Sequence, residues 1–542
     1  MSVRGTFVFH IALVLLMGAA ATLPGLWQEK RTDGREVRHA EIAREMVERG
    51  EYLVPHLLGR PYTDKTPLFN WVVAGLYRLT GQVNIGLARL PSALSAIAAG
   101  VAIYLLGRRW LAPRAGLLSS LMWFTFPLVS LWGRRARMDM LLTALVLSAI
   151  VFATSAAARK PRHTWAAWLA SGILISLATL AKGPIALFFF TVALPVVWRA
   201  EAGRWLPPAR FLLALLAILL LSLTAWIIPC EIRHPGHLKA MLTYQFGEGL
   251  EEHEKRAILY IDALLVWTFP WALFAAGAAA VMLRRIRQVG IDGVSVPAIV
   301  FVACLAAMIL VPNKRPHYLL PIVPLWALWL GMYLHEVAAS TARTWQFHRA
   351  LTLPLYIYFS LLLYLAIALL ACMAGLGAVP WAKLSSCSPI RLIAPVLLVA
   401  MLAGGGLVAT WRGSRRIALW FLLTTTLLVT AVGYPTLATC FWEQEPEIAS
   451  ANAAAWSIPR GCPLGEYGAD SELLHFKLNR PVVHLTGGDD LCSFLTQPGP
   501  WCLLVPSREV VPVREMSPRT LRELGTWRVG RRCEITALFA EP

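Results

Sequence analysis

Residues 27–65 read WQEKRTDGREVRHAEIAREMVERGEYLVPHLLGRPYTDK, and they separate the first apolar run of the chain from all the later ones. Eight of these residues are acidic and stand among many basic ones, although 57% of the whole chain is hydrophobic. Charge beside a lipid bilayer costs free energy unless it faces water or a charged partner. A charged loop of this length therefore predicts a site rather than a linker.

The stretch divides into a turn, a helix and an apolar patch. The Asp-Gly pair at 33–34 is a turn signal. Residues 36–49 place small and apolar side chains at the spacing of an amphipathic helix, and Gly50 ends that helix. The apolar residues within 52–58 are typical of a patch that lies on a membrane surface.

The composition of the chain is that of a polytopic membrane protein. Its 542 residues include 22 tryptophans and only 15% charged residues, and the mean hydropathy is +0.59. The formal net charge is +19. Most Lys and Arg residues stand in short loops between apolar runs, so the positive-inside rule and attraction to anionic membrane lipids explain the charge without a nucleic-acid partner.

Thirteen apolar runs are long enough to cross a bilayer. The first has the length of an uncleaved helix rather than of a signal peptide. Residues 67–81 are shorter and carry polar side chains, so we expect them in the membrane interface. The runs are 6–26, 90–112, 115–132, 139–158, 164–181, 184–198, 211–230, 261–283, 294–312, 317–336, 352–376, 392–411 and 417–438.

The charges of the loops orient these runs. With the N-terminus inside and residues 67–81 not counted as a span, every inside loop is basic, as the positive-inside rule requires. Counting 67–81 as a span would reverse all of these loops. The basic clusters stand at 108–114, 159–162, 199–210, 284–287, 343–349 and 412–416. The tail that begins near residue 440 is therefore expected outside.

The outside loops then hold charges that the rule does not place there. They are the opening segment 27–65, RRARMD at 134–139, AKGP at 181–184, the loop 231–257 with its EEHEKR sequence, and PNKRPHY at 312–318. Cations kept on this side of the membrane predict a binding site for an anion.

The tail, residues 440–542, predicts a small outside α/β domain. Helix-like pieces at 445–456, 471–478 and 517–524 alternate with strand-like pieces at 482–485, 501–505 and 527–539. We therefore divide the chain into a membrane domain, 1–439, with an outside juxtamembrane segment at 27–82, and the soluble domain. Five cysteines in the tail indicate an oxidising compartment, but the sequence does not choose among their pairings.

Six motifs resemble the lipid-linked-sugar glycosyltransferases of the GT-C fold, an all-α polytopic membrane fold. The resemblance covers roughly the first two thirds of the chain and is greatest to the bacterial relatives of protein O-mannosyltransferases that include the lipid A aminoarabinose transferases. The motifs are RHAEIAREM (38–46), YLVPHLLGRPYTDKTPLFNW (52–71), ARLPSALSA (88–96), RRARMDMLLT (134–143), ATLAKGP (178–184) and KRPHYLLPIVP (314–324).

The resemblance implies a bacterial inner-membrane enzyme with its active site on the periplasmic side. Such enzymes transfer a sugar from a polyprenyl-phosphate donor, here undecaprenyl phosphate–4-amino-4-deoxy-L-arabinose, to lipid A or another envelope acceptor. A protein acceptor and a non-enzymatic lipid or polysaccharide transporter remain the alternatives. The family chemistry needs no nucleotide, and the sequence leaves a divalent metal open.

The resemblance also implies acids that act on the acceptor. The family places Asp-Glu before the Arg-x-Ala-Glu-Ile motif, and here Glu36 matches the Glu whereas the Asp position holds Arg35. Asp33 stands two residues earlier, and the turn after it would bring it to the same place. Asp33 is therefore the first candidate for the base and Glu36 the second. Asp139 matches an acid of the second outside loop that lines the cavity in relatives.

Six basic or hydroxyl side chains match or lie near the family's phosphate-binding elements. For Arg38, an ion pair with a helix neighbour is the alternative; for Lys65, it is an interfacial lysine. Lys182 is interpreted as a helix-end cation. The six lipid-phosphate or substrate candidates are Arg38, Lys65, His253, Arg256, Lys314 and Tyr318. Asp64 and His253 form the candidate metal pair.

Overall fold

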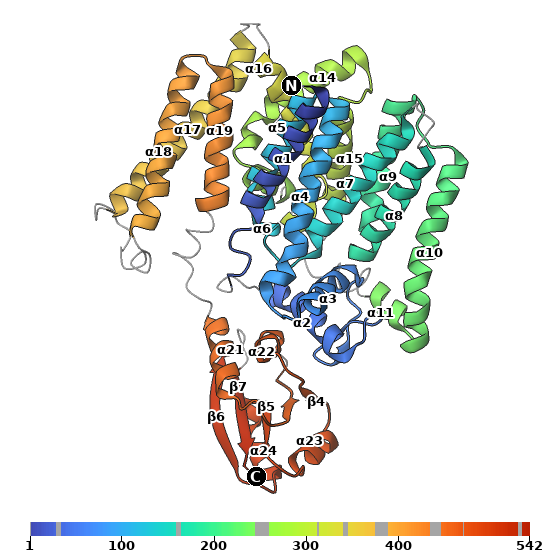
Figure 1. Ribbon diagram of the computed structural model, residues 1–542, viewed down its shortest axis with the longest axis vertical. Helices are drawn as coiled ribbons and strands as arrows, with labels where there is room; N and C mark the ends of the chain where they lie inside the picture. The colour runs from blue at the N-terminus through green and yellow to red at the C-terminus, as the bar shows by residue number, and fades with distance from the viewer. Residues whose placement is uncertain are drawn as a thin grey trace. The chain divides into compact units, whose positions relative to one another are not determined.

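The fold was analysed in a computed structural model, which forms two compact units (Figure 1). The membrane unit comprises residues 1–26, 64–66 and 89–441, and the juxtamembrane–tail unit comprises residues 27–63, 67–88 and 442–542. The structure describes residues 2–28, 34–158, 164–243, 259–311, 314–339, 345–373, 389–433, 446–469, 471–528 and 534–541.

The membrane unit is built from helices, in agreement with the predicted all-α membrane class. Each of the 13 predicted runs coincides with a helix or with a broken pair of helices. The elements are α1 (Val3–Thr22), α4 (Ile85–Trp110), α5 (Pro113–Thr125), α6 (Pro127–Trp132), α7 (Met138–Ala157), α8 (Thr164–Lys182), α9 (Ile185–Ala202), α10 (Ala209–Arg233), α11 (His237–Thr243), α13 (Leu259–Trp267), η4 (Trp271–Phe274), α14 (Ala275–Val289), α15 (Val296–Leu310), η5 (Pro316–Leu319), α16 (Val323–Ala339), α17 (Trp345–Met373), α18 (Pro389–Trp411), α19 (Arg415–Leu428) and η7 (Val429–Gly433).

Fewer of these helices have the length and apolarity of a full membrane span than the sequence predicts. Within the described residues eight helices qualify, or nine if the pair formed by α13 and η4–α14, bent by 109°, counts as one span. Several predicted runs are broken or short: the run 115–132 divides between α5 and α6, and α15 has only 15 residues. The polytopic fold is confirmed, whereas the number 13 stays a prediction.

The antiparallel pair α7 and α8 positions the site of the membrane unit. A short connection joins the two helices, and they pack along their length (Figure 1). Antiparallel packing brings the first residue of one helix beside the last residue of the next. The start of α7, with Asp139, therefore lies beside the end of α8, with Lys182. Trp168 of α8 fixes the other end of this bundle, because its indole donates to the Phe211 carbonyl at 2.6 Å.

The juxtamembrane part of the second unit begins with the predicted amphipathic helix, α2 (Gly34–Arg49), which is confirmed. The strands β1 (His56–Leu57) and β2 (Arg60–Pro61) form a hairpin, and the helix α3 (Leu68–Thr80) follows. Leu58 and Gly59 make the turn at φ 53° and 75°, as a two-residue hairpin loop with both residues in the left-handed region requires. The carboxylate of Glu45 accepts from the backbone N–H groups of Leu58 and Gly59.

The apolar segment 52–58 is less exposed than a membrane-surface patch would be. Val54 is fully buried and Leu58 is buried, so the expectation of a surface patch is wrong for these two residues. The backbone N–H of Leu58 is bound by the Glu45 carboxylate of α2, which holds the turn against that helix.

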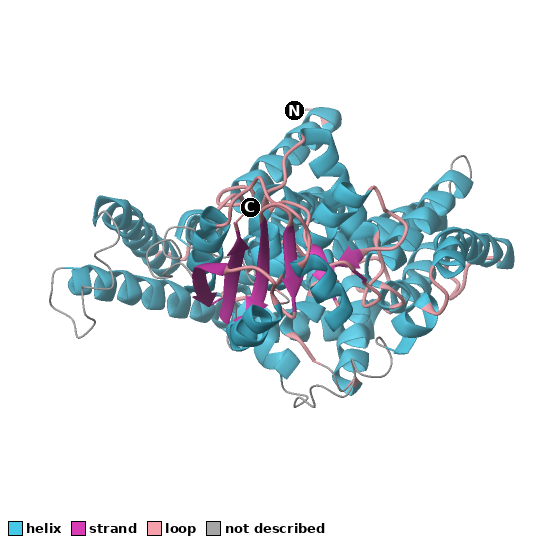
Figure 2. Cartoon of the chain, turned by 90° about the horizontal axis from the view of Figure 1, so that it is seen from below, coloured by secondary structure: helices cyan, strands magenta, loops and turns pink. Residues whose placement is uncertain are grey.

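The tail forms a five-stranded mixed sheet with helices beside it (Figure 2). The strand order is β4-β3-β5-β7-β6, in which β3 is parallel to β4 and β5, and β7 is antiparallel to β5 and β6. The elements are α21 (Pro446–Ser457), β3 (Leu464–Tyr467), α22 (Glu472–Leu478), β4 (Val483–Leu485), α23 (Gly488–Leu495), β5 (Trp501–Pro506), η8 (Ser507–Glu509), α24 (Val510–Met516), β6 (Leu521–Arg528) and β7 (Glu534–Ala540).

The α/β class of the tail is confirmed, but two of its predicted elements are wrong. The segment 517–524, expected to be a helix, contains the start of β6 at Leu521. The segment 527–539, expected to be one strand, contains the end of β6 and all of β7 except Ala540. Cross-strand pairing with β7 overrides the local helical spacing in 517–524. The domain boundary at 439 stays a proposal, and the segment 27–82 packs on the tail through α2 and α22.

Candidate functional site

An ion pair between Lys182 and Asp139 lies at the centre of the candidate site in the membrane unit. Lys182 Nζ donates to Asp139 Oδ1, and both side chains are largely withdrawn from solvent. The pair joins the last turn of α8 to the first turn of α7. A lysine held by a buried carboxylate keeps its position and presents its remaining N–H groups in a defined direction.

A series of aromatic rings begins beside this ion pair. Lys182 Nζ lies 4.7 Å from the centroid of the Tyr318 ring, a cation–π contact. His317 meets Tyr318 edge to face at 4.9 Å and stacks on Trp132 at 5.6 Å. Trp132 in turn meets Trp267 edge to face. These rings give the cationic side chains one apolar wall, which strengthens electrostatic attraction beside it.

Lys65 belongs to the same unit and is coupled to the same charges. Burial is the largest cause that lowers the pKa of Lys65, to about 8, and the positive charge of Lys182 lowers it further. The carboxylates of Asp64 and Asp139 act in the opposite direction. Burial is thus the main reason for the lowered pKa, and the neighbouring cations add to it. An anion bound beside these cations would offset their repulsion.

Positive charge exceeds negative charge in this cluster. Lys65, Asp139 and the described charged groups that act on either of them comprise four cations and two carboxylates. The cations are Lys65, Lys182, Arg137 and Arg315, and the carboxylates are Asp64 and Asp139. This balance suits a phosphate group, because lysine and arginine N–H groups form charge-assisted hydrogen bonds with phosphate oxygens. The site can thus hold a phosphate and stabilise negative charge that develops on it.

The loop after α15 supplies further predicted residues. Tyr318, on η5, lies against Lys182 as described above. Lys314 is buried, and its ammonium donates to the Val311 carbonyl at 2.7 Å, just after the end of α15. Lys314 therefore satisfies a backbone carbonyl at the end of α15. Binding of a phosphate by Lys314 stays a prediction.

The juxtamembrane–tail unit holds two other predicted residues. Glu36 lies in the first turn of α2 and is fully buried. Arg38 donates through Nε to Glu472 Oε1 of the tail at 2.8 Å. This partner is 434 positions away in the chain, whereas Glu41 of α2 binds Arg44. A role of Arg38 at the lipid phosphate stays a prediction.

Three predicted residues lie outside the described residues: Asp33, His253 and Arg256. The structure therefore compares neither Asp33 with Glu36 nor Asp64 with His253 as a metal pair. Asp64 itself is described, half-buried and near enough to affect the charge of Lys65.

Sequence reasoning missed three side chains of the site. Lys182 was interpreted as a helix-end cation, although its AKGP motif was among the stretches that resemble the family. His317 lies inside another of these motifs, and its position between Tyr318 and Trp132 could not be inferred from spacing. For Trp132, no motif gave a signal.

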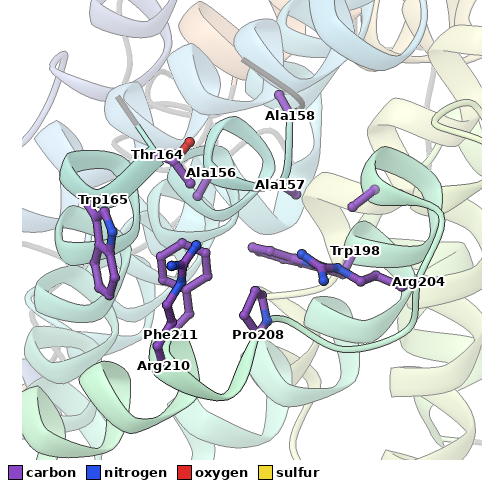
Figure 3. A pocket seen from close by; sticks show the side chains of 11 residues that line it. Ala156, Ala157, Ala158, Thr164, Trp165, Trp198, Arg204, Pro208, Arg210 and Phe211 are labelled. Atoms are coloured by element: carbon purple, nitrogen blue, oxygen red, sulfur yellow. The ribbon is translucent and has the colours of Figure 1, made fainter. Parts of the chain in front are cut away.

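A cavity of about 580 Å³ lies elsewhere in the membrane unit (Figure 3). Its walls come from the end of α7, the start of α8, the end of α9 and the residues that lead into α10. The Arg210 guanidinium lies over the rings of Trp165 and Phe211, 5.8 and 5.3 Å from their centroids. α7 has 20 residues and is therefore about 30 Å long. The cavity is at the opposite end of α7 from Asp139, so it is not the site of the Lys65 cluster.

Comparison with known proteins finds a family whose model matches the segment that holds the cluster. Residues 64–228 match the model of a family described as dolichyl-phosphate-mannose-protein mannosyltransferase. The match covers less than a third of the 542 residues, so it shows a similarity to this family within that segment. The matched segment contains Lys65, Asp139 and Lys182, the residues at the centre of the site.

Two similar proteins carry the name undecaprenyl phosphate-alpha-4-amino-4-deoxy-L-arabinose arabinosyl transferase. That of Pseudomonas fluorescens, transferase 1, is 28% identical over 357 residues, which are 63% of this chain and 62% of that protein. That of Edwardsiella ictaluri is 26% identical over 353 residues, 62% of this chain and 60% of that protein. The matches thus span about three fifths of the length of these relatives.

Two solved structures have the same fold over their whole length. The crystal structure of ArnT from Cupriavidus metallidurans in the apo state aligns with a TM-score of 0.71 and 17% identity, covering 100% of both chains. The structure of the same protein bound to undecaprenyl phosphate aligns with a TM-score of 0.69 and 18% identity, again over 100% of both chains. At these identities the likeness shows the fold alone, which is the GT-C fold of ArnT.

Proposed function

We propose that this protein is a membrane glycosyltransferase that moves a sugar from a polyprenyl-phosphate donor to an envelope acceptor. The observation that carries the proposal is the cationic cluster of Lys65 and Lys182 beside Asp139, within the segment that matches the family. A donor whose leaving group is a lipid-linked phosphate needs positive charge held where the phosphate departs.

The reaction that fits this cluster is a displacement at the anomeric carbon of the donor sugar. An acceptor oxygen forms the new glycosidic bond while the bond between the anomeric carbon and the phosphate oxygen breaks, and the electron pair of that bond leaves with polyprenyl phosphate. Lys65 and Lys182 stabilise the negative charge that grows on the leaving phosphate. Asp139 holds Lys182 in position through the ion pair.

A carboxylate outside this cluster acts as the base and accepts the proton of the acceptor hydroxyl. Asp33 and Glu36 are the two candidates for the base, and the family motif does not choose between them because Arg35 occupies the expected Asp position. Asp33→Asn and Glu36→Gln, made separately, should divide the candidates. Replacement of the true base should lower the transfer rate by about 100-fold or more, as expected of acid–base catalysis, and replacement of the other should not.

The names of the relatives support a finer assignment. Both are named for undecaprenyl phosphate-aminoarabinose, and a similar fold has been solved with undecaprenyl phosphate. We therefore propose undecaprenyl phosphate–4-amino-4-deoxy-L-arabinose as the donor and lipid A as the acceptor. The basic loops on the inside would place the site on the periplasmic face of the inner membrane. The family description keeps a protein acceptor as the second candidate.

The test is sugar transfer by the purified full-length chain from a synthetic polyprenyl-phosphate sugar. Loss of one charge-assisted contact to a leaving phosphate costs about 3–4 kcal/mol of barrier, a rate loss of about 100- to 1000-fold. Lys65→Ala should show that loss, whereas Lys239→Ala, at an exposed lysine of α11, should transfer at the wild-type rate. Equal rates for wild type and Lys65→Ala would refute the assignment. Movement of the intact lipid-linked sugar without release of polyprenyl phosphate would instead indicate a transporter.

A further inference from the structure

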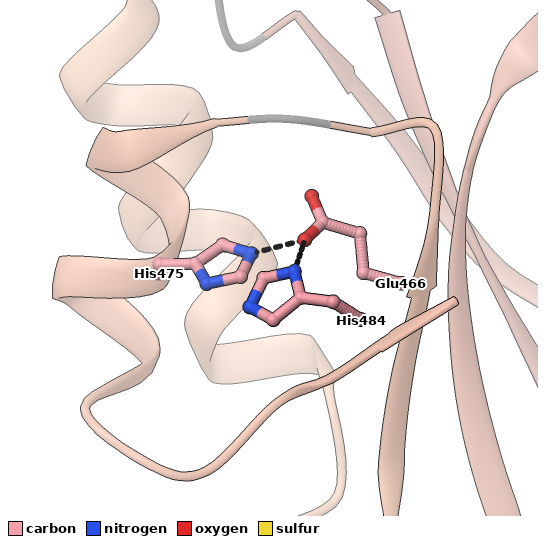
Figure 4. Close-up of side chains that lie close together, drawn as sticks. All are labelled: Glu466, His475 and His484. Atoms are coloured by element: carbon pink, nitrogen blue, oxygen red, sulfur yellow. Dashed lines mark ion pairs between the residues drawn. The ribbon is translucent and has the colours of Figure 1, made fainter. Parts of the chain in front are cut away.

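Two histidines and a glutamate of the tail form a compact cluster that the proposed reaction does not use. Glu466 comes from β3, His475 from α22 and His484 from β4. Each offers one ligand atom, and these atoms all lie within 4.8 Å of one another. Figure 4 shows both imidazole rings turned toward the same carboxylate: Glu466 Oε2 lies 2.8 Å from His475 Nε2 and 3.0 Å from His484 Nδ1.

The interior of this cluster leaves polar atoms without hydrogen bonds. Glu466 and His475 side chains are each 1% exposed, whereas His484 is 16% exposed. Among the described residues, neither oxygen of Glu466 nor His475 Nε2 has a hydrogen-bond partner of acceptable geometry, although the distances are short. Buried polar groups are normally hydrogen-bonded. A cation bound between these carboxylate and imidazole atoms would satisfy them.

We propose that Glu466, His475 and His484 bind a Zn²⁺ ion. Two imidazole nitrogens and one carboxylate are a donor set that zinc favours over the harder cations, which prefer oxygen alone. Zinc–nitrogen and zinc–oxygen bonds of about 2.0–2.2 Å around a tetrahedral ion place ligand atoms roughly 3.2–3.6 Å apart. The present separations of 2.8 and 3.0 Å reach that range when the side chains move outward by a few tenths of an ångström. Solvent can supply the fourth ligand on the side of His484, the more exposed residue.

Residues around the cluster hold the rings in place. The two imidazoles stack, with centroids 5.1 Å apart and planes inclined by 18°. The hairpin turn lies against the second ring: a Cβ atom added at Gly59 would stand 2.5 Å from His484 Cδ2. The negative charge of Glu41, on α2, acts on His475. The stacking and the close approach of Gly59 restrict the orientation of the rings, and the negative charge of Glu41 favours a cation nearby.

The proposed ion has a structural role within the juxtamembrane–tail unit. It would join β3, β4 and α22, and α22 packs on α2, to which Glu472 is also bound through Arg38. A metal that binds only the folded arrangement contributes its binding free energy to folding. The zinc would thus stabilise the tail together with the juxtamembrane helix, and this role is independent of the proposed transferase reaction.

The competing explanation is a metal-free ion pair. Burial lowers the pKa of His475, but the Glu466 carboxylate outweighs burial, and the net effect raises the pKa. A protonated His475 beside Glu466 would thus satisfy charge without any ion. The two explanations differ in a measurable way, because only the zinc site binds metal with a defined stoichiometry.

The experiment uses the full-length chain purified in detergent. Cys462 and Cys502 are first replaced by Ala, because their sulfur atoms lie 3.3 Å apart and could take up zinc themselves. The protein is treated with a chelator and titrated with ZnCl₂ by calorimetry, and its melting temperature is recorded with and without zinc. We expect one zinc per chain and a rise in melting temperature. In the same background Glu466→Gln should weaken zinc binding by about 100-fold or more, since loss of partners behind a ligand alone already costs about 10- to 100-fold.

The matched control is Glu523→Gln, an exposed glutamate on β6 of the same sheet, which should bind zinc as the parent does. Co²⁺ added in place of zinc should give the visible absorption of a tetrahedral site in the parent and lose it in Glu466→Gln. If Glu466→Gln does not purify as a folded protein, His484→Gln at the more exposed ligand takes its place. No zinc uptake by the parent, or equal uptake by parent and ligand variants, would overturn the proposal in favour of the metal-free ion pair.

Discussion

The lowered pKa of Lys65 predicts that phosphate binding weakens as the pH rises from 7 to 9. With a pKa of about 8, the free lysine is roughly nine-tenths protonated at pH 7 and roughly one-tenth protonated at pH 9. Only the protonated form attracts phosphate. The affinity is therefore highest well below pH 8 and falls as the pH rises through that value. The expected loss is about tenfold between pH 7 and pH 9, which is about 1.4 kcal/mol.

The assay is equilibrium binding of undecaprenyl phosphate to the purified full-length protein at pH 7, 8 and 9 and at constant ionic strength. A phosphate monoester loses its second proton near pH 6, so the ligand itself changes little over this range. The bound phosphate raises the pKa of Lys65 in the complex, and the logarithm of affinity should thus fall by about one per pH unit above pH 8.

Lys65→Arg is the matched control for this prediction. Arginine stays protonated throughout the range, so the variant should lose the pH dependence whatever its absolute affinity. An affinity of the wild type that does not change between pH 7 and pH 9 would refute the reasoning. The same pH slope in Lys65→Arg would also refute it, because the titrating group would then be another residue.

Three further predictions concern stability and the thiols. Lys182→Met should leave the buried Asp139 without its lysine partner and destabilise the chain by about 3–5 kcal/mol. The double variant Lys182→Met with Asp139→Asn should recover part of the lost melting temperature. No recovery would show that Lys182 and Asp139 are not energetically coupled. Gly59→Ala should cost at least about 1–2 kcal/mol, because φ is 75° there, and an unchanged thermal melt would contradict the turn geometry. Mild oxidation should join Cys462 to Cys502, whose sulfur atoms lie 3.3 Å apart, and peptide mapping under non-reducing conditions that finds a different pair would contradict this arrangement.

The parts of the fold that depend on local sequence were predictable. Apolar runs of spanning length gave the helices of the membrane unit, and the spacing within 36–49 gave α2, because both patterns are set by neighbours a few residues apart. The segment 517–524 was not predictable in this way. From Leu521 onward it forms β6 through pairing with β7, which follows it in the chain. The spacing of its apolar residues alone did not distinguish a helix from this strand.

Some residues of the candidate site could likewise be predicted from the sequence, and others could not. Lys65, Asp139 and Tyr318 could be predicted because each stands in a stretch that resembles the family. Lys182 was missed as a site residue because a lysine at a helix end has an ordinary explanation, and only the packing of α7 on α8 gives it Asp139 as a partner. The Arg38 ion pair joins positions far apart in the chain, which no pattern in a single sequence reveals.

The proposed zinc-binding cluster could not be predicted from the sequence either. Its three residues are separated by eight other residues at each step, a spacing that matches no short metal motif. Pairing of β3 with β4 and the return of α22 between them create the site. The sequence alone therefore gave no reason to prefer Glu466 over the other acids of the tail.

The most direct test of the central proposal is an experimental structure of the full-length protein with undecaprenyl phosphate. The account predicts that the phosphate lies within hydrogen-bond distance of Lys65 Nζ, with Lys182 beside it and still paired with Asp139. A phosphate bound instead in the cavity beside Trp165, at the other end of α7, would contradict the account.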